Sequence, residues 1–209
     1  MNVPLIAHVS AASHLVPAAV GLWYWKRLSL PMRVLVFYFN FTVLVEITEL
    51  ILALLGIHNI FVINIHRIVE FVSFMYFFRH HVHHHTYREA MAILSMLYIV
   101  LWFTEVSFDP FPKQHSEFIN TVSNIALLIV SVAVSFYLFT TSQGNLTSQS
   151  TFWICLGAIL TFSSTVIIYS LGNTVLALGI EHFTLLWHFN WGFSIIANIL
   201  YARSFLCQQ

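Results

Sequence analysis

Seven apolar runs, each long enough to cross a hydrocarbon core of about 30 Å as a helix, constrain the fold of this chain more than any other feature. They lie near residues 4–25, 32–56, 59–78, 90–107, 117–139, 151–172 and 179–203. Little of the 209-residue chain lies outside them. The sequence therefore predicts an all-α integral membrane protein, with one seven-helix transmembrane domain over residues 1–209.

The composition excludes an ordinary soluble domain. Hydrophobic residues make up 59% of the chain and charged residues only 8%, whereas a soluble domain carries about 25% charged residues. The connections leave no room for a soluble catalytic or signalling domain. We expect a multi-pass protein of the plasma or inner membrane whose main partner is the lipid bilayer, with no nucleic-acid partner.

The basic residues predict the orientation of the helices. Six of them flank the spans at positions that share one side of the membrane: Lys26, Arg27, Arg33, Arg79, Arg88 and Arg203. Lys113 falls on the other side, and Arg67 lies within a span. Basic residues that flank spans stay on the cytoplasmic side. The N-terminus is therefore expected outside and the C-terminus in the cytoplasm.

Polar residues gather on the second and third spans, which a connection of a few residues near Gly56 joins into an antiparallel hairpin. Counting from the tip of this hairpin predicts that Glu46 lies about level with Glu70, near the middle of the bilayer. Charged groups at this depth are costly unless they are paired. Arg67 is the expected partner of Glu46, Glu49 or Glu70.

The leading functional hypothesis follows from these groups. Three glutamates face one arginine, so a proton, a cation or a histidine must supply the missing positive charge. The predicted site is a buried cavity, open to the outer side, that senses or conducts a proton, a cation or a small polar ligand. Its residues are Glu46, Glu49, His66, Arg67, Glu70 and His188.

A metal-dependent hydrolase of lipid-like substrates is the alternative. Histidine nitrogen and carboxylate oxygen suit zinc or iron, and the candidate ligands are His14, His66, Glu70 and His188. The chain resembles the seven-helix zinc hydrolases of the ceramidase and adiponectin-receptor type in its span count and its intramembrane histidine and acidic residues. It departs from them in its last span, where His182 and His188 are six residues apart and no His-x-x-x-His pair is present.

Seven spans with the N-terminus outside also resemble microbial rhodopsins. Those proteins hold retinal on a lysine of the last helix, and this chain has only Lys26 and Lys113. Covalent retinal is therefore not expected.

A histidine-rich run follows the third span and is expected to form a cytoplasmic loop. Its five histidines are His80, His81, His83, His84 and His85. Such a run can bind metal, or it can be a solvated segment near lipid headgroups whose charge rises in mild acid. A second alternative for the whole chain is a membrane subunit or effector that acts through a protein partner, either a second copy of the chain or another membrane protein.

Overall fold

A computed structural model of the chain describes residues 4–82, 84–108, 117–142 and 144–207, and these residues form helices without any strand. The helices are α1 (Leu5–Ser13), α2 (Leu15–Tyr24), α3 (Leu30–Leu54), α4 (Ile60–His81), α5 (His85–Phe108), α6 (Glu117–Thr141), α7 (Ser150–Leu178) and α8 (Ile180–Leu206). Single 3-10 turns at Trp25–Arg27 and Leu146–Ser148 precede α3 and α7. The all-helical prediction is confirmed over the described ranges.

The helices α1 and α2 form one rod with a break at His14. Pro17 has no backbone N–H, so it cannot bond to the carbonyl of Ser13 four residues earlier. His14 keeps helical backbone angles, with φ −62° and ψ −23°. The chain therefore bends at this point without turning back.

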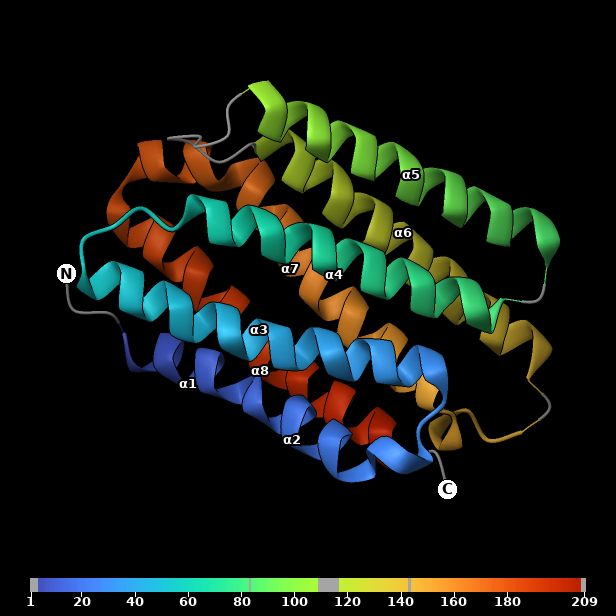
Figure 1. Ribbon diagram of the computed structural model, residues 1–209. Coiled ribbons are helices and arrows are strands. Elements are labelled where there is room, and N and C mark those ends of the chain that lie inside the picture. The colour runs from blue at the N-terminus through green and yellow to red at the C-terminus, as the bar shows by residue number, and fades with distance from the viewer. Residues whose placement is uncertain (1–3, 83, 109–116, 143, 208–209) are drawn as a thin grey trace.

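Six rods form a closed ring, and a seventh lies outside it (Figure 1). The ring runs from α1 and α2 through α3, α4, α6, α7 and α8, and α8 packs back onto α1 and α2. Helix α5 lies outside the ring, against α4 and α6. The two ends of the chain lie at opposite ends of the bundle.

Six stretches among the described residues are long and apolar enough to cross a membrane: Leu5–Arg27, Leu30–Leu54, Phe61–His81, His85–Thr104, Ile119–Thr141 and Ser150–Leu171. These six agree with a multi-pass membrane protein. Helix α8 has 27 residues, but polar side chains such as His188, Asn190 and Asn198 leave it less apolar than the others. It is therefore long enough to be a seventh span without having the composition of one.

The connection between α3 and α4 is a hairpin, as predicted. Gly56 adopts a left-handed conformation with φ 67°, its N–H donates to the Ala53 carbonyl at 3.2 Å, and the N–H of Ile57 donates to the Leu52 carbonyl at 2.9 Å. This pair of bonds ends a helix and favours glycine at the left-handed position.

The predicted depths of the polar residues along this hairpin are wrong. Glu70 lies beside Tyr38, with a hydrogen bond between the two side chains, and not beside Glu46. The reason is that α3 extends beyond the start of α4: its last residues are highly exposed, and Asn59 lies in the same groove as Glu49. Counting residues equally along both helices from the connection therefore places each residue of α4 too close to the tip of the hairpin.

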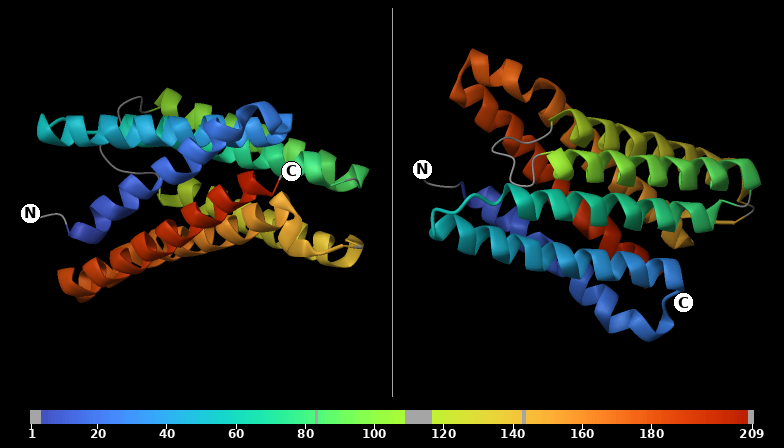
Figure 2. Two further views of the ribbon diagram at one scale, coloured as in Figure 1. Left: turned by 90° about the horizontal axis from the view of Figure 1, so that it is seen from below. Right: turned by 45° about the horizontal axis from the view of Figure 1, so that its top comes forward.

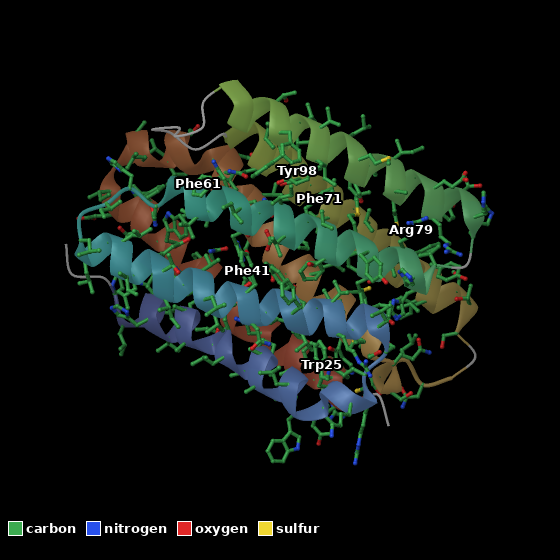
Figure 3. The ribbon with its side chains drawn as sticks, in the orientation of Figure 1. Trp25, Phe41, Phe61, Phe71, Arg79 and Tyr98 are labelled. Carbon is green, nitrogen blue, oxygen red and sulfur yellow. The ribbon has the colours of Figure 1, made fainter. Side chains whose placement is uncertain are left out.

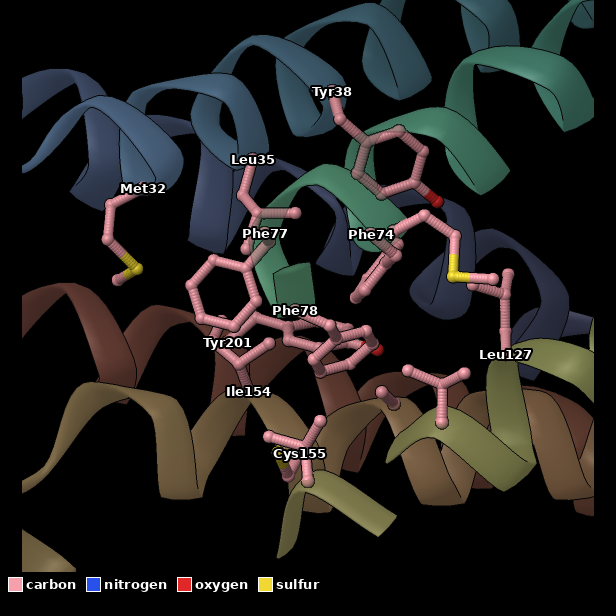
Figure 4. Close-up of a cluster of buried hydrophobic side chains, with 14 of the residues drawn as sticks. Met32, Leu35, Tyr38, Phe74, Phe77, Phe78, Leu127, Ile154, Cys155 and Tyr201 are labelled. Atoms are coloured by element: carbon pink, nitrogen blue, oxygen red, sulfur yellow. The ribbon is translucent and has the colours of Figure 1, made fainter. Parts of the chain in front are cut away.

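One half of the bundle has an apolar core rich in aromatic rings (Figure 4). It is formed mainly by the first half of α3, the second half of α4, the first half of α7 and the last turns of α8, with further residues from α2, α5 and α6. Its largest fully buried side chains include Phe39, Phe74, Phe77, Phe78, Phe162 and Phe205. This core closes the bundle at the end where α3 begins and α8 ends.

Two glycines let helices approach closely in that same half. A Cβ at Gly157 would lie 2.6 Å from Cε1 of Tyr201, and a Cβ at Gly21 would collide with the side chain of Val36. Real Cβ atoms are not found so close to other heavy atoms. Glycine at these positions lets α7 contact α8 and lets α2 contact α3.

Candidate functional site

A polar cavity of about 200 Å³ lies inside the ring, next to the aromatic core. Side chains from α1, α3, α4, α7 and α8 line it, and His14 lines it at the break between α1 and α2. The lining includes Ser10, His14, Tyr38, Thr42, Glu46, His66, Arg67, Glu70, Ser164, Asn190, Trp191, Asn198 and Tyr201. Figure 3 draws the described side chains as sticks and labels Phe41, whose ring stacks on that of His66 in the cavity wall.

Arg67 and Glu70 form an ion pair on α4. Arg67 Nη1 donates to Glu70 Oε2 at 2.7 Å, and the Tyr38 hydroxyl donates to Glu70 Oε1 at 2.9 Å. Arg67 Nη2 donates to the Tyr169 hydroxyl at 2.9 Å, and its guanidinium lies 5.4 Å from the centre of the Tyr169 ring. Both oxygens of Glu70 are occupied, and the pair is neutral as a whole.

His66 is held by α3. Its Nε2 lies 3.0 Å from Oγ1 of Thr42, whose hydroxyl donates to the Tyr38 carbonyl at 3.0 Å. Because a hydroxyl has one hydrogen to donate, Thr42 accepts from the Nε2–H of His66. The ring also stacks on Phe41, with centroids 6.3 Å apart and planes 16° apart. These contacts fix its orientation.

A second pair joins His14 to α3. Nδ1 of His14 lies 3.6 Å from Oε1 of Glu46 and 3.3 Å from the Ala11 carbonyl. The side chain of Glu46 is 37% exposed, against 6% for Glu70. The two carboxylates that line the cavity therefore differ: Glu70 is enclosed and fully bonded, while Glu46 is accessible and has a single histidine partner.

Helices α7 and α8 form the opposite wall, with uncharged polar groups. Ser164 donates to Oδ1 of Asn190 at 2.9 Å, and Nδ2 of Asn198 donates to the Ser13 hydroxyl at 2.7 Å. The second bond ties α8 to the bend between α1 and α2. This wall offers hydroxyl and amide groups to a bound species without adding charge.

Two predicted site residues lie outside this cavity. Glu49 lines a groove next to it, between α1 and α3. His188 is absent from the residues that line the cavity: its Nδ1 bonds to the carbonyl of Thr184 at 2.7 Å, and its ring contacts Trp191 edge to face. The residues next to it on α8 that line the cavity are Trp187, Asn190 and Trp191.

Most of the histidine-rich run belongs to helices and not to a loop. Helix α4 continues through His80 and His81, and α5 begins at His85, which pairs with Glu89 at 3.4 Å. Nδ1 of His80 and of His81 bond to carbonyls one turn earlier. His84 lies between the two helices, and His83 lies outside the described residues. The predicted loop is therefore shorter than expected.

The predicted metal ligands do not form a metal site. Over the described ranges, no three His, Cys, Asp or Glu side chains lie close enough together to hold a metal ion. Glu70 already accepts from Arg67 and Tyr38, and His188 does not line the cavity. The donor set does not fit zinc or iron in this arrangement.

Several residues of the site were not predicted from the sequence. Tyr38 and Thr42 precede Glu46 by eight and four residues, so a helical stripe through Glu46 contains both. On α8 the lining residues are Trp187, Asn190, Trp191, Ser194, Asn198 and Tyr201. Their spacing of three and four residues is that of one helix face. Tyr169, far along the chain, has no comparable local pattern.

Comparison with known proteins gives no relative from which to assign this site. No model of a protein family matches the chain, no curated protein matches it, and no solved structure matches it. The fold and the site define a multi-pass, all-helical membrane protein with a polar cavity inside its ring of helices.

Proposed function

We propose that the chain is a seven-helix membrane protein that binds a proton or a small cation between His14 and Glu46, in a cavity reached from the outer side. In this proposal the protein senses the proton or cation. The observation that carries the proposal is the 3.6 Å contact between His14 and Glu46, the accessible pair of the cavity.

The charges of the cavity support a bound cation. Arg67 and Glu70 neutralise each other, which leaves the carboxylate of Glu46 with one neighbouring histidine. An ionised carboxylate at this depth of a membrane costs several kcal/mol, of order 3 on insertion scales. A proton shared with His14, or a cation beside it, removes that cost. The hydroxyl and amide groups of α7 and α8 supply further ligands.

The position of the aromatic core supports one-sided access. Phe39, which lines the cavity, belongs to this core, and Tyr201 lies 4.9 Å from Phe39 between ring centroids. The core fills the bundle between the cavity and the end where α3 begins. A species in the cavity is therefore separated from that end by packed rings. This arrangement favours binding and sensing over continuous conduction.

The basic residues support the orientation. Six of the seven described lysines and arginines lie at helix ends or in connections at the end of the bundle that the aromatic core closes: Lys26, Arg27, Arg33, Arg79, Arg88 and Arg203. Trp25 and Arg79 lie toward this end in Figure 3, and Phe61 lies toward the other. Basic residues mark the cytoplasmic side. In the proposed topology α8 is a seventh span, stabilised by its neighbours α1, α2 and α7.

The metal-dependent hydrolase has less support, because its ligands are separated or already bonded. A role as a subunit that binds a protein partner is supported by α5, because only 11% of its most apolar stretch is buried within the bundle. Lipid also accounts for that exposure. The cavity therefore carries the proposal.

Infrared spectroscopy of the protein in lipid nanodiscs tests this proposal. We expect a carboxylic-acid band in the pH-difference spectrum that is lost in Glu46→Gln and shifts in His14→Gln. Glu181→Gln, on the exposed first turn of α8, is the matched control and should keep this band. A difference spectrum that Glu46→Gln leaves unchanged, both on titration with acid and on addition of Na⁺ or K⁺, would refute the proposal.

A further inference from the structure

A second hollow lies beside the polar cavity, between α1 and α3. Its volume is about 470 Å³, more than twice that of the cavity. Its lining includes Ala11, Leu15, Glu46, Glu49, Ala53 and Trp191. Ser10, Glu46 and Trp191 also line the cavity. The two spaces are therefore adjacent and share a wall.

The bend at His14 explains why this groove exists. Helix α2 contacts α3 closely at Gly21 and Val36, whereas α1, beyond the bend, packs on α8. Figure 2 shows α1 leaving α3 toward the N-terminal end of the bundle. The groove occupies the space between the two helices on that side.

The wall of the groove is apolar and open to the side. Leu15, Ile47 and Leu50 are 54%, 51% and 56% exposed, so in a membrane they contact lipid chains. Alanines complete the wall on α1 and at the end of α3. A volume of this size lies within the range of about 300 to 1,000 Å³ that organic ligands occupy. A bare ion needs no such wall.

Two carboxylates give the groove its charge. Glu46 and Glu49 are three residues apart on α3 and both line the groove. Neither lysine nor arginine is among the lining residues. Glu46 has His14 as its neighbour, and Glu49 makes no ion pair with the part of the chain that is described. The groove therefore combines an acidic floor with an apolar side.

We propose that this groove binds a single-chain cationic amphiphile. Its amine or quaternary ammonium head lies beside Glu46 and Glu49, and its alkyl chain passes between α1 and α3 into the lipid. An anionic head would meet two carboxylates without a lysine or an arginine, and a neutral head would leave their charge uncompensated. The proposal deepens the proposed function through the shared residue Glu46, but it also requires Glu49, which that function does not use.

Fluorescence quenching tests the head group, because Trp191 lies in the groove wall. The probe is a trimethylammonium amphiphile with a brominated alkyl chain, added to the protein in nanodiscs of uncharged lipid. The alcohol and the carboxylate with the same brominated chain are compared with it. The Trp191→Phe variant shows which part of the quenching comes from Trp191. We expect saturable quenching by the cation alone. Equal quenching by all three heads, or full competition by tetramethylammonium without a chain, would overturn the proposal.

Substitutions test the two parts of the groove. Glu49→Gln should weaken binding of the cationic probe about tenfold, a change of about 1.4 kcal/mol, while Glu181→Gln should not. Ala11→Phe should fill the groove and abolish binding, and Ala90→Phe on the exposed side of α5 is the matched control. Unchanged binding in Glu49→Gln or in a folded Ala11→Phe would refute the proposal.

The same variants separate this proposal from the proposed function. Glu49→Gln should keep the infrared band of Glu46, whereas Ala11→Phe is assessed by probe binding alone, because the Ala11 carbonyl contacts His14. Loss of probe binding with the band intact is the expected result. If the parent protein shows the infrared band but does not bind the probe, only the proposal of a bound amphiphile is refuted. If it binds the probe but does not show the band, only the proposal of a proton site is refuted.

Discussion

The Tyr38 hydroxyl on α3 donates to Oε1 of Glu70 on α4 at 2.9 Å. Arg67 donates to the other oxygen of the same carboxylate at 2.7 Å. Glu70 is thereby a fixed part of the interior. The polar cluster expected from the sequence divides into a closed pair, Arg67 with Glu70, and an accessible pair, His14 with Glu46. Of these two pairs, the second has the accessible carboxylate.

Removal of Arg67 should be strongly destabilising. Arg67→Met leaves the Glu70 carboxylate buried with Tyr38 as its one remaining donor among the described contacts. The cost of breaking a buried pair in this way is about 3 kcal/mol or more. The free energy of unfolding in mixed micelles, taken from a denaturant titration, measures it.

The double substitution Arg67→Met, Glu70→Gln is the informative partner of that variant. It removes both charges, so it should recover much of the stability that the single change loses. Arg88→Met at the exposed start of α5 is the control and should change stability by less than about 0.5 kcal/mol. A double variant no more stable than Arg67→Met would show that the charges of the pair do not depend on each other.

Gly157→Ala should destabilise the bundle by about 1 to 3 kcal/mol, as overpacking does. Its new methyl group would lie 2.6 Å from the Tyr201 ring, so α7 and α8 would have to separate. Gly192→Ala on α8 is the control, because nothing lies within 4 Å of a Cβ there and alanine favours a helix. Thermal unfolding of the two variants compares them, and equal melting temperatures would contradict the close packing described here.

The two cysteines provide a test of topology. Cys155 is fully buried, and Cys207 lies just beyond α8 and is partly exposed. A membrane-impermeant thiol reagent added to sealed vesicles with their outer face exposed should leave Cys207 unlabelled. His58→Cys, at the α3–α4 connection, should react in the same vesicles when Cys207 is replaced by serine. Labelling of Cys207 from outside would place α8 or the orientation differently.

The helices and the hairpin could be predicted because apolar length and local signals determine them. Residues near Gly56 mark the hairpin, and the i, i+3 spacing of Arg67 and Glu70 brings their charges together on α4. Both depend on residues that are close in sequence. Which residues of α3 and α4 lie side by side depends on how far α3 extends beyond the start of α4. No pattern of neighbouring residues in the sequence predicts that.

The position of His188 could not be predicted for a related reason. One residue along a helix rotates a side chain by about 100°, so the cavity receives Trp187 and Trp191 while His188 points elsewhere. Composition favours histidine as a functional residue, but the face of α8 is chosen by its packing on α1, α2 and α7. The contact of Arg67 with Tyr169, 102 residues away, likewise depends on the closure of the ring.

The close approaches at Gly21 and Gly157 lie in the same half of the bundle as the aromatic core. They pin α2 to α3 and α7 to α8 at that end. At the opposite end α7 and α8 are joined by the single residue Gly179, whereas α1 diverges from α3 and makes no such close approach among the described contacts. In the proposed function, a bound species would therefore enter and leave beside the diverging ends of α1 and α3, while the opposite end of the bundle stays closed by its aromatic core.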